Sequence, residues 1–159
     1  MFLYIFYAIF VLLILMALGL AYKIAMADMR RRIIPDAYLF PLIIIGAVLT
    51  TFFPWPHDIA SGVVGMTFGY IMAATIGLIF DRVITRHNPG ADTPIGMGDI
   101  KLIATGGLWC GPTGLAITLV FACIFGAGWA YRKKQKFIPF APFFIISGIL
   151  SLIITAFLL

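Results

Sequence analysis

The chain has 159 residues, of which 63% are hydrophobic and only 11% are charged. A soluble domain of this size is closer to half apolar, so this composition and the mean hydropathy of +1.11 exclude an ordinary soluble protein and predict an integral membrane protein. The net charge of +5 is concentrated in a few loops. We therefore expect these loops to contact membrane lipids, and we expect no nucleic-acid partner.

Six apolar segments are candidates for membrane-spanning helices, each of which needs roughly 20 residues. They cover residues 2–23, 37–54, 59–80, 98–111, 113–131 and 139–158. The first is taken as a retained helix because its apolar run is too long for a signal peptide and no positive charge precedes it. The sequence therefore predicts an all-α fold in which residues 1–159 form a single domain, one bundle of six transmembrane helices.

Lysine and arginine residues alternate between the loops of this predicted bundle. They follow the first, third and fifth segments: Lys23, Arg30, Arg31, Arg32, Arg82, Arg86, Arg132, Lys133, Lys134 and Lys136. The loops after the second and fourth segments have none. Because loops rich in Lys and Arg remain in the cytoplasm, this pattern predicts that both termini lie on the non-cytoplasmic side.

Two of the six aspartates stand out, and the sequence has no glutamate. Asp28 follows the first segment and Asp99 opens the fourth, so the topology above puts both at the cytoplasmic membrane edge. An ionisable side chain there is a functional candidate by default. If the two carboxyl groups meet, they would share one proton; one would activate a water molecule and the other would polarise a peptide carbonyl group. This chemistry is aspartyl proteolysis.

The residues beside Asp99 have functional and structural explanations. Gly96 and Gly98 leave the backbone bare, so that an extended peptide could approach it closely. Lys101 either reaches the lipid headgroups, positions a substrate leader or lowers the pKa of Asp99 through its positive charge. Asp99 itself has a structural alternative as the N-cap of its helix.

The other aspartates are explained mainly by helix capping or by solvation. Asp36 is expected to cap the second helix or to contact substrate, and Asp58 to cap the third helix. If Asp28 is not catalytic, we expect it to be a solvated residue in a basic loop. The two cysteines, Cys110 and Cys123, form no CxxC pair, so we expect no metal site and no cofactor.

Three motifs resemble those of one enzyme family, the type IV prepilin peptidases, which are intramembrane aspartyl proteases. GMGDIKLIATGGLWCG is similar to their GxGD segment, and ADMRRRIIPD is similar to their first aspartate segment. IPFAPFF is similar to the Ile-Pro-Phe-Gly-Pro motif that opens their last helix. Asp36 stands where Asn is common, and Ala141 replaces the usual Gly.

The resemblance implies that Asp28 and Asp99 are the catalytic residues. The other motif residues would bind substrate or shape the site: Gly96, Gly98, Lys101, Pro35 and Pro139. Prepilin, Flp pilin or pseudopilin substrates would lose a short basic leader at the cytoplasmic face of a prokaryotic inner (plasma) membrane. Longer members carry an N-terminal domain with paired CxxC motifs and also methylate the product; these 159 residues have no such pair, and we expect no methyltransferase activity.

Two other function classes remain open. A proton-coupled transporter would use Asp99 as its ion site, although no acid lies near a mid-bilayer position. A non-catalytic assembly scaffold would tolerate the replacement of either aspartate by asparagine. Under the peptidase hypothesis, the apolar helix of the substrate docks laterally against the bundle and the loop 81–97 moves to admit it.

Overall fold

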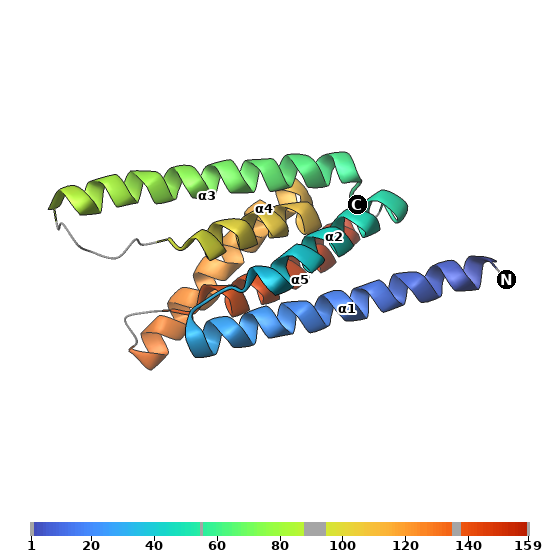
Figure 1. The fold of residues 1–159 in the computed structure, drawn as a ribbon, viewed down its shortest axis with the longest axis horizontal. Coiled ribbons are helices and arrows are strands. Elements are labelled where there is room, and N and C mark those ends of the chain that lie inside the picture. Colours follow the sequence, from blue (N-terminus) through green and yellow to red (C-terminus); the bar gives the residue numbers. More distant parts are fainter. Residues whose placement is uncertain (1, 55, 88–94, 135–137, 159) are drawn as a thin grey trace.

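The computed structural model describes residues 2–54, 56–87, 95–134 and 138–158, and all regular structure in them is α-helical (Figure 1). The helices are α1 (Phe2–Arg31), α2 (Asp36–Phe52), α3 (Ile59–His87), α4 (Met97–Lys133) and α5 (Phe140–Leu158). All except α2 are long and apolar enough to cross a membrane. The chain is an all-α membrane protein with several spans.

The prediction of six transmembrane helices is wrong. The described residues form five helices, of which four are candidate spans. The segments predicted at 98–111 and 113–131 belong to one element, α4, and the predicted second helix is α2, which has only 17 residues. The predicted placement of both termini on the non-cytoplasmic side depended on a count of six spans, so the structure does not support it.

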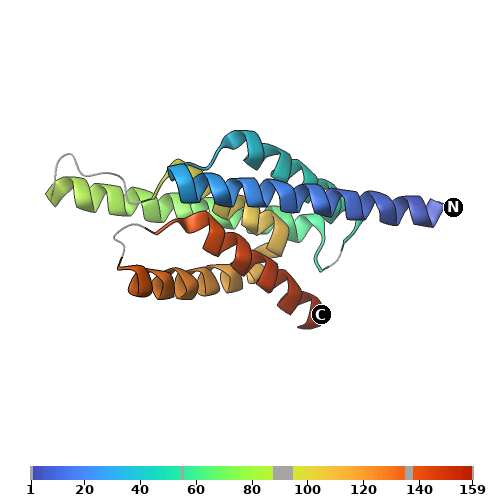
Figure 2. The same ribbon diagram turned by 90° about the horizontal axis from the view of Figure 1, so that it is seen from below.

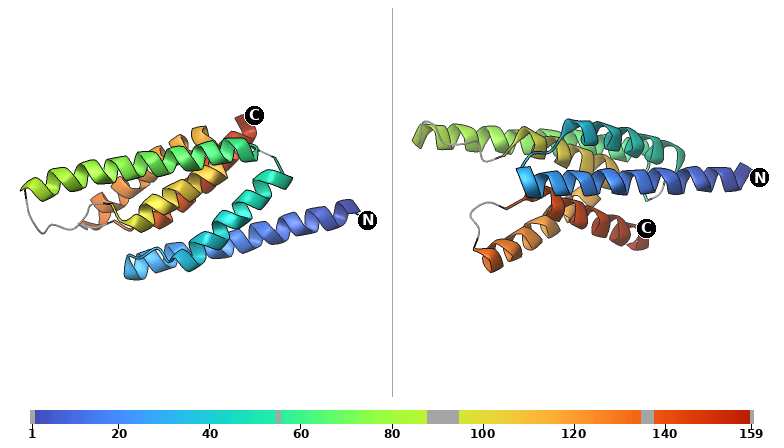
Figure 3. Two further views of the ribbon diagram at one scale, coloured as in Figure 1. Left: turned by 45° about the horizontal axis from the view of Figure 1, so that its top comes forward. Right: turned by 60° about the horizontal axis from the view of Figure 1, so that its bottom comes forward.

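The helix α4 folds back on itself at Gly111. This residue has φ 66° and ψ 178°, a conformation that glycine adopts readily because it has no Cβ. Pro112 has no backbone N–H and cannot continue a regular hydrogen-bond ladder. Helical turns continue directly on both sides, and the two arms, 97–110 and 112–133, run in opposite directions (Figures 1 and 3). Two predicted helices therefore appear as one element.

A histidine from the segment between α2 and α3 supports this reversal. In a regular helix the carbonyl oxygen of Leu108 would accept a hydrogen bond from the N–H of residue 112, which is a proline. His57 Nε2 lies 3.1 Å from that oxygen instead. Because a carbonyl oxygen only accepts, the His57 ring must carry a proton on Nε2 and donate it.

The helices α3 and α4 pack at close range through glycines. A Cβ added at Gly65 would collide with the carbonyl oxygen of Gly107, and a Cβ at Gly107 would collide with that of Gly65. Small residues at facing positions allow the backbones of membrane helices to approach in this way. This contact fixes the first arm of α4, which carries Asp99, against α3.

The helix α1 is the least enclosed element. Its first turns extend beyond the ends of the other helices (Figure 2). Large apolar side chains there are exposed, among them Leu3 at 64% and Tyr4 at 81%. An apolar surface of this extent suits lipid rather than water.

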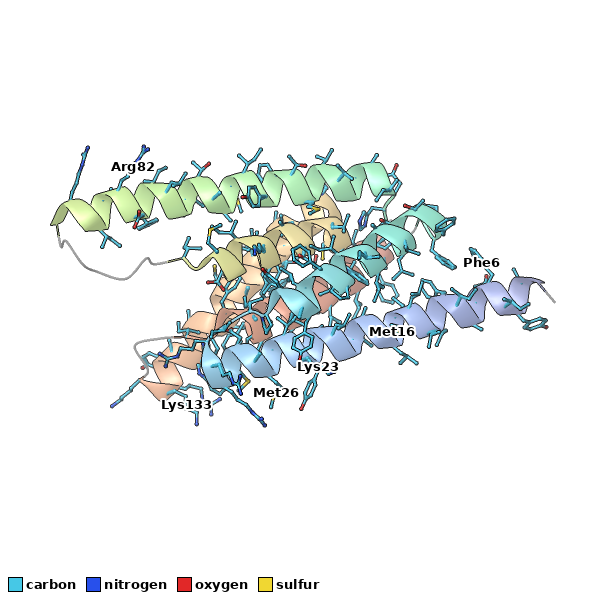
Figure 4. All side chains as sticks on the ribbon, in the orientation of Figure 1. Phe6, Met16, Lys23, Met26, Arg82 and Lys133 are labelled. Atoms are coloured by element: carbon cyan, nitrogen blue, oxygen red, sulfur yellow. The ribbon has the colours of Figure 1, made fainter. Side chains whose placement is uncertain are left out.

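Basic side chains gather at one end of the molecule. Arg82 near the end of α3 and Lys133 at the end of α4 lie at this end, and Phe6 lies at the opposite one (Figure 4). The last turn of α1, with Arg30 and Arg31, is at the same end as Lys133 (Figure 1). We call this the basic end. The starts of α2, α4 and α5 also lie there, and so do both candidate aspartates.

Candidate active site

Asp28 lies in the last turn of α1 and is buried, with 6% of its surface exposed. The helix continues to Arg31, beyond the predicted limit of 23, because its inner face continues with Ile24 and Asp28, one turn apart. Asp28 Oδ2 accepts a hydrogen bond of 2.8 Å from the backbone N–H of Ala141. That N–H belongs to the first turn of α5, where backbone donors have no partner within the helix. Asp28 therefore caps α5 from a distant part of the chain.

Asp99 is the third residue of α4 and is half-buried. Its Oδ2 accepts a hydrogen bond of 3.2 Å from the backbone N–H of Gly96, the residue that precedes the helix. The N-cap is therefore Gly96, and Asp99 occupies the third helical position, from which a carboxylate reaches back to the cap. The helix start fixes the backbone of Asp99, and only one of its carboxylate oxygens bonds to a described group.

The fold brings the two aspartates together. They are 71 positions apart in the sequence, yet the carboxyl groups are close enough to interact electrostatically. Asp28 comes from the end of α1 and Asp99 from the start of α4, both at the basic end (Figure 1). Among the described residues, no group of three His, Cys, Asp or Glu side chains lies together that could hold a metal ion.

The short linker between α1 and α2 passes directly over the start of α4. Arg32 has φ 53°, a left-handed conformation that ends α1, and its N–H bonds to the carbonyl oxygen of Asp28 at 2.9 Å. Ile34 is buried against Gly98: a Cβ at Gly98 would lie 2.9 Å from the Cβ of Ile34. The space beside Gly98 is thus filled by Ile34, whereas Gly96 is exposed.

The remaining motif residues lie around the same helix starts. Pro35 is the N-cap residue of α2, and the expected side-chain cap by Asp36 is not formed. Asp36 is instead the first residue of α2, and its Oδ2 accepts a hydrogen bond from Lys101 Nζ at 2.7 Å. Lys101 is therefore paired with Asp36. Pro139 directly precedes α5 and the N–H of Ala141 that Asp28 binds.

Two further sequence expectations have clear outcomes. Asp58 caps α3 as predicted, because its Oδ1 accepts a hydrogen bond of 3.0 Å from the N–H of Ser61. The loop predicted at 81–97 is shorter, since α3 continues to His87. The part of that loop at 88–94 lies outside the described residues.

Sequence reasoning missed an apolar groove between α1 and α5. A cavity of about 340 Å³ is lined by residues of α1, α2, α4 and α5, and a second of about 410 Å³ adjoins it. The two cavities share Ile14, Trp109, Leu152 and Ile153. At the end toward the aspartates the first cavity is lined by Ala21, two turns before Asp28 on α1, and by Phe144, one turn after Ala141 on α5. No pattern singled out in the sequence predicts this groove, since the space beside Gly106 is filled by the Phe144 ring.

Comparison with known proteins shows which family the chain matches. Residues 5–131 match the type IV leader peptidase family. The chain is 26% identical over 131 residues to a prepilin leader peptidase/N-methyltransferase of Xanthomonas campestris, covering 76% of this chain and 42% of the relative. It is 30% identical over 127 residues to the protein of that name from Dichelobacter nodosus, covering 78% and 42%.

A third relative of the same name, from Escherichia coli K12, is 27% identical over 136 residues, covering 81% of this chain and 57% of the relative. The chain therefore spans about half the length of the curated relatives it matches. No solved structure matches the chain.

Proposed function

The chain belongs to the type IV leader peptidase family, and we propose that it is an aspartic endopeptidase that removes the basic leader of prepilin-like proteins. Type IV pilins, Flp pilins and pseudopilins are the proposed substrates. One arrangement carries the proposal: Asp28 and Asp99 come from separate helix ends at the basic end of the molecule, and the Asp28 carboxyl group is close enough for its charge to act on Asp99.

In the proposed mechanism the two carboxyl groups act as a unit. Two carboxyl groups that share a site hold one proton between them, and the proton belongs to the pair rather than to either residue. The ionised group takes a proton from a water molecule, which attacks the scissile carbonyl carbon. The protonated group donates a hydrogen bond to the carbonyl oxygen, where negative charge develops. The carboxyl pair then gives a proton to the amide nitrogen as the C–N bond breaks, and the leader leaves with a new carboxyl group. Asp28 is held by the Ala141 N–H and Asp99 by the Gly96 N–H while this happens.

The charge distribution supports an active site that faces the cytoplasm. The site lies at the basic end, where the last turns of α1 and α4 carry arginine and lysine and α3 carries Arg82 near its end. Segments rich in Lys and Arg are retained on the cytoplasmic side of the inner membrane. A substrate whose basic leader is also cytoplasmic would present its cleavage site at this depth.

The groove between α1 and α5 supports a route for the substrate. Its lining is apolar, and it leads from Ala21 and Phe144, about two turns from Asp28 along α1, toward the opposite end of the molecule. An apolar helix that enters sideways from the bilayer would lie along it without leaving a lipid-like environment. The leader would remain at the headgroups, so that the peptide bond between leader and helix reaches the aspartates.

The experiment that tests the proposal is cleavage of a prepilin-like substrate by the purified chain in liposomes. We expect wild-type protein to remove the leader, and Asp28→Asn and Asp99→Asn each to lower the rate by roughly 10²- to 10⁴-fold or more, the usual value of acid–base catalysis. Asp58→Asn is the matched control, since Asp58 caps α3 away from the site and should leave the rate unchanged.

Two results would overturn the proposal. One is the absence of cleavage by folded wild-type protein with several substrates that carry basic leaders. The other is cleavage that continues at the wild-type rate in either active-site variant. Proton flux into liposomes, lost in Asp99→Asn, would then favour transport.

A further inference from the structure

We propose that the linker between α1 and α2 is a clamp that sets the spacing of Asp28 and Asp99, and that Ile34 and Asp36 are positioning residues. The clamp consists of two contacts between the linker and the start of α4: Ile34 with Gly98, and Asp36 with Lys101. The inference rests on the proposed function and assigns a role to residues that do not touch the reacting atoms.

The need for a clamp follows from how the helices pack. The two aspartates are carried by α1 and α4, but these helices make no close backbone contact with each other in the described residues. The helix α1 packs on α2 and α5, and α4 packs on α3, α5 and α2. The relative position of the two carboxyl groups is therefore set through other parts of the chain. One route is α5, which packs on both helices and donates the Ala141 N–H to Asp28. The other is the linker, which follows Asp28 directly and contacts the start of α4.

The first contact is steric. The linker is tied to Asp28 by the hydrogen bond from the Arg32 N–H to the Asp28 carbonyl oxygen, at 2.9 Å. Two residues later Ile34 is buried, and its Cβ occupies the space that a side chain at Gly98 would need. Gly98 is the neighbour of Asp99, so any displacement of Ile34 moves the backbone that carries the second carboxyl group. Interiors packed this closely transmit such displacements.

The second contact is electrostatic. Asp36 Oδ2 and Lys101 Nζ are 2.7 Å apart, and the side chains are 46% and 36% exposed. An ion pair exposed to this extent contributes little to stability. It does, however, tie α4 to the start of α2 at a second point, on the other side of Asp99 from the Ile34 contact. The same ion pair holds the Lys101 ammonium group beside the Asp36 carboxylate.

The steady-state kinetics of leader cleavage by the purified full chain in liposomes test the inference. Misplacement of a reacting group by about 1 Å costs on the order of 100-fold in rate, so we expect Gly98→Ala, Asp36→Asn and Lys101→Met each to lower kcat by roughly 10- to 100-fold. KM should stay within about twofold, because substrate binding is not altered. Gly128→Ala is the control for Gly98→Ala, since nothing lies within 4 Å of a Cβ there.

A double-mutant cycle distinguishes the ion pair from two independent effects. If Asp36 and Lys101 act only through each other, the double variant Asp36→Asn/Lys101→Met loses no more kcat than either single variant. Lys101→Arg keeps a donor for Asp36 and should recover most of the rate. Thermal unfolding should be nearly unchanged in all three pair variants, and it shows whether each variant is folded.

Several results would overturn the clamp without affecting the proposed function, which wild-type cleavage and its loss in Asp99→Asn establish separately. Multiplicative losses in the double variant would mean that the two residues act independently. An increase in KM with an unchanged kcat for Asp36→Asn would mean that Asp36 binds the basic leader. A normal kcat in folded Gly98→Ala would mean that the Ile34 contact does not set the spacing.

Discussion

Asp28 has two separable roles in this structure, and a pair of substitutions distinguishes them. The side chain is buried and is both a proposed catalytic group and the acceptor for the Ala141 N–H at the start of α5, at 2.8 Å. Asp28→Ala removes the acceptor and leaves a buried N–H unpaired, which costs about 1–3 kcal/mol of unfolding free energy. Asp28→Asn retains an acceptor oxygen and loses only the charge at the positive end of α5, about 0.3–1 kcal/mol.

We therefore expect both variants to be inactive but only Asp28→Ala to be clearly destabilised. The measurements are leader cleavage in liposomes and the equilibrium unfolding of each variant by denaturing detergent, with wild-type protein as the reference. Gly19→Ala on the same helix is a suitable control, because nothing lies within 4 Å of a Cβ at that position. Equal stability of Asp28→Ala and wild type would refute the capping role, and normal cleavage by Asp28→Asn would refute the catalytic role.

Three further predictions concern packing, the groove and the product. Gly65→Ala should lower the unfolding free energy by about 1–3 kcal/mol, because its Cβ meets the backbone of Gly107. Equilibrium unfolding in detergent measures this free energy, and an unchanged value would contradict the close α3–α4 contact. Gly148→Leu should raise the KM of leader cleavage several-fold and leave kcat unchanged, since residue 148 lines the groove and has room for a Cβ. Gly128→Leu, outside the groove, should change neither value in the same assay. The mass of the cleaved substrate should show an unmethylated N-terminus, and a mass increase of one methyl group would show that residues 1–159 also methylate.

The helix positions were predictable from hydropathy wherever an apolar segment ends at a residue that breaks helices. The predicted segments 37–54 and 139–158 correspond to α2 and α5 within two residues at each end. The break at Gly111 was located correctly, because the predicted segments end at 111 and begin again at 113, and the structure has helical turns on both sides of a non-helical Gly111. The prediction of six spans failed because hydropathy counts apolar segments and does not show how helical turns are joined or whether a segment reaches the length of a span.

The candidate site was predictable only as a set of separate motifs. The sequence indicated Asp28 and Asp99 because each is an acid at the end of an apolar segment, and it indicated the segment at Pro139 through its resemblance to a family motif. It gave no indication that the Ala141 N–H is the partner of Asp28, 113 positions away, or that Lys101 pairs with Asp36, 65 positions away. Such contacts depend on the packing of whole helices, which single-segment patterns do not contain.

The first arm of α4 is shorter than the bilayer, and this has a consequence for His57. The arm comprises residues 97–110 and is about 21 Å long at 1.5 Å per residue, whereas the hydrocarbon core is about 30 Å thick. With the basic end at the headgroups, as proposed above, the reversal at Gly111 lies within the hydrocarbon, where no bulk water can satisfy a free carbonyl group. The His57 ring supplies the missing hydrogen bond to Leu108 at that depth. An imidazole in the segment before α3 thus replaces water and allows the chain to reverse direction before it has crossed the membrane.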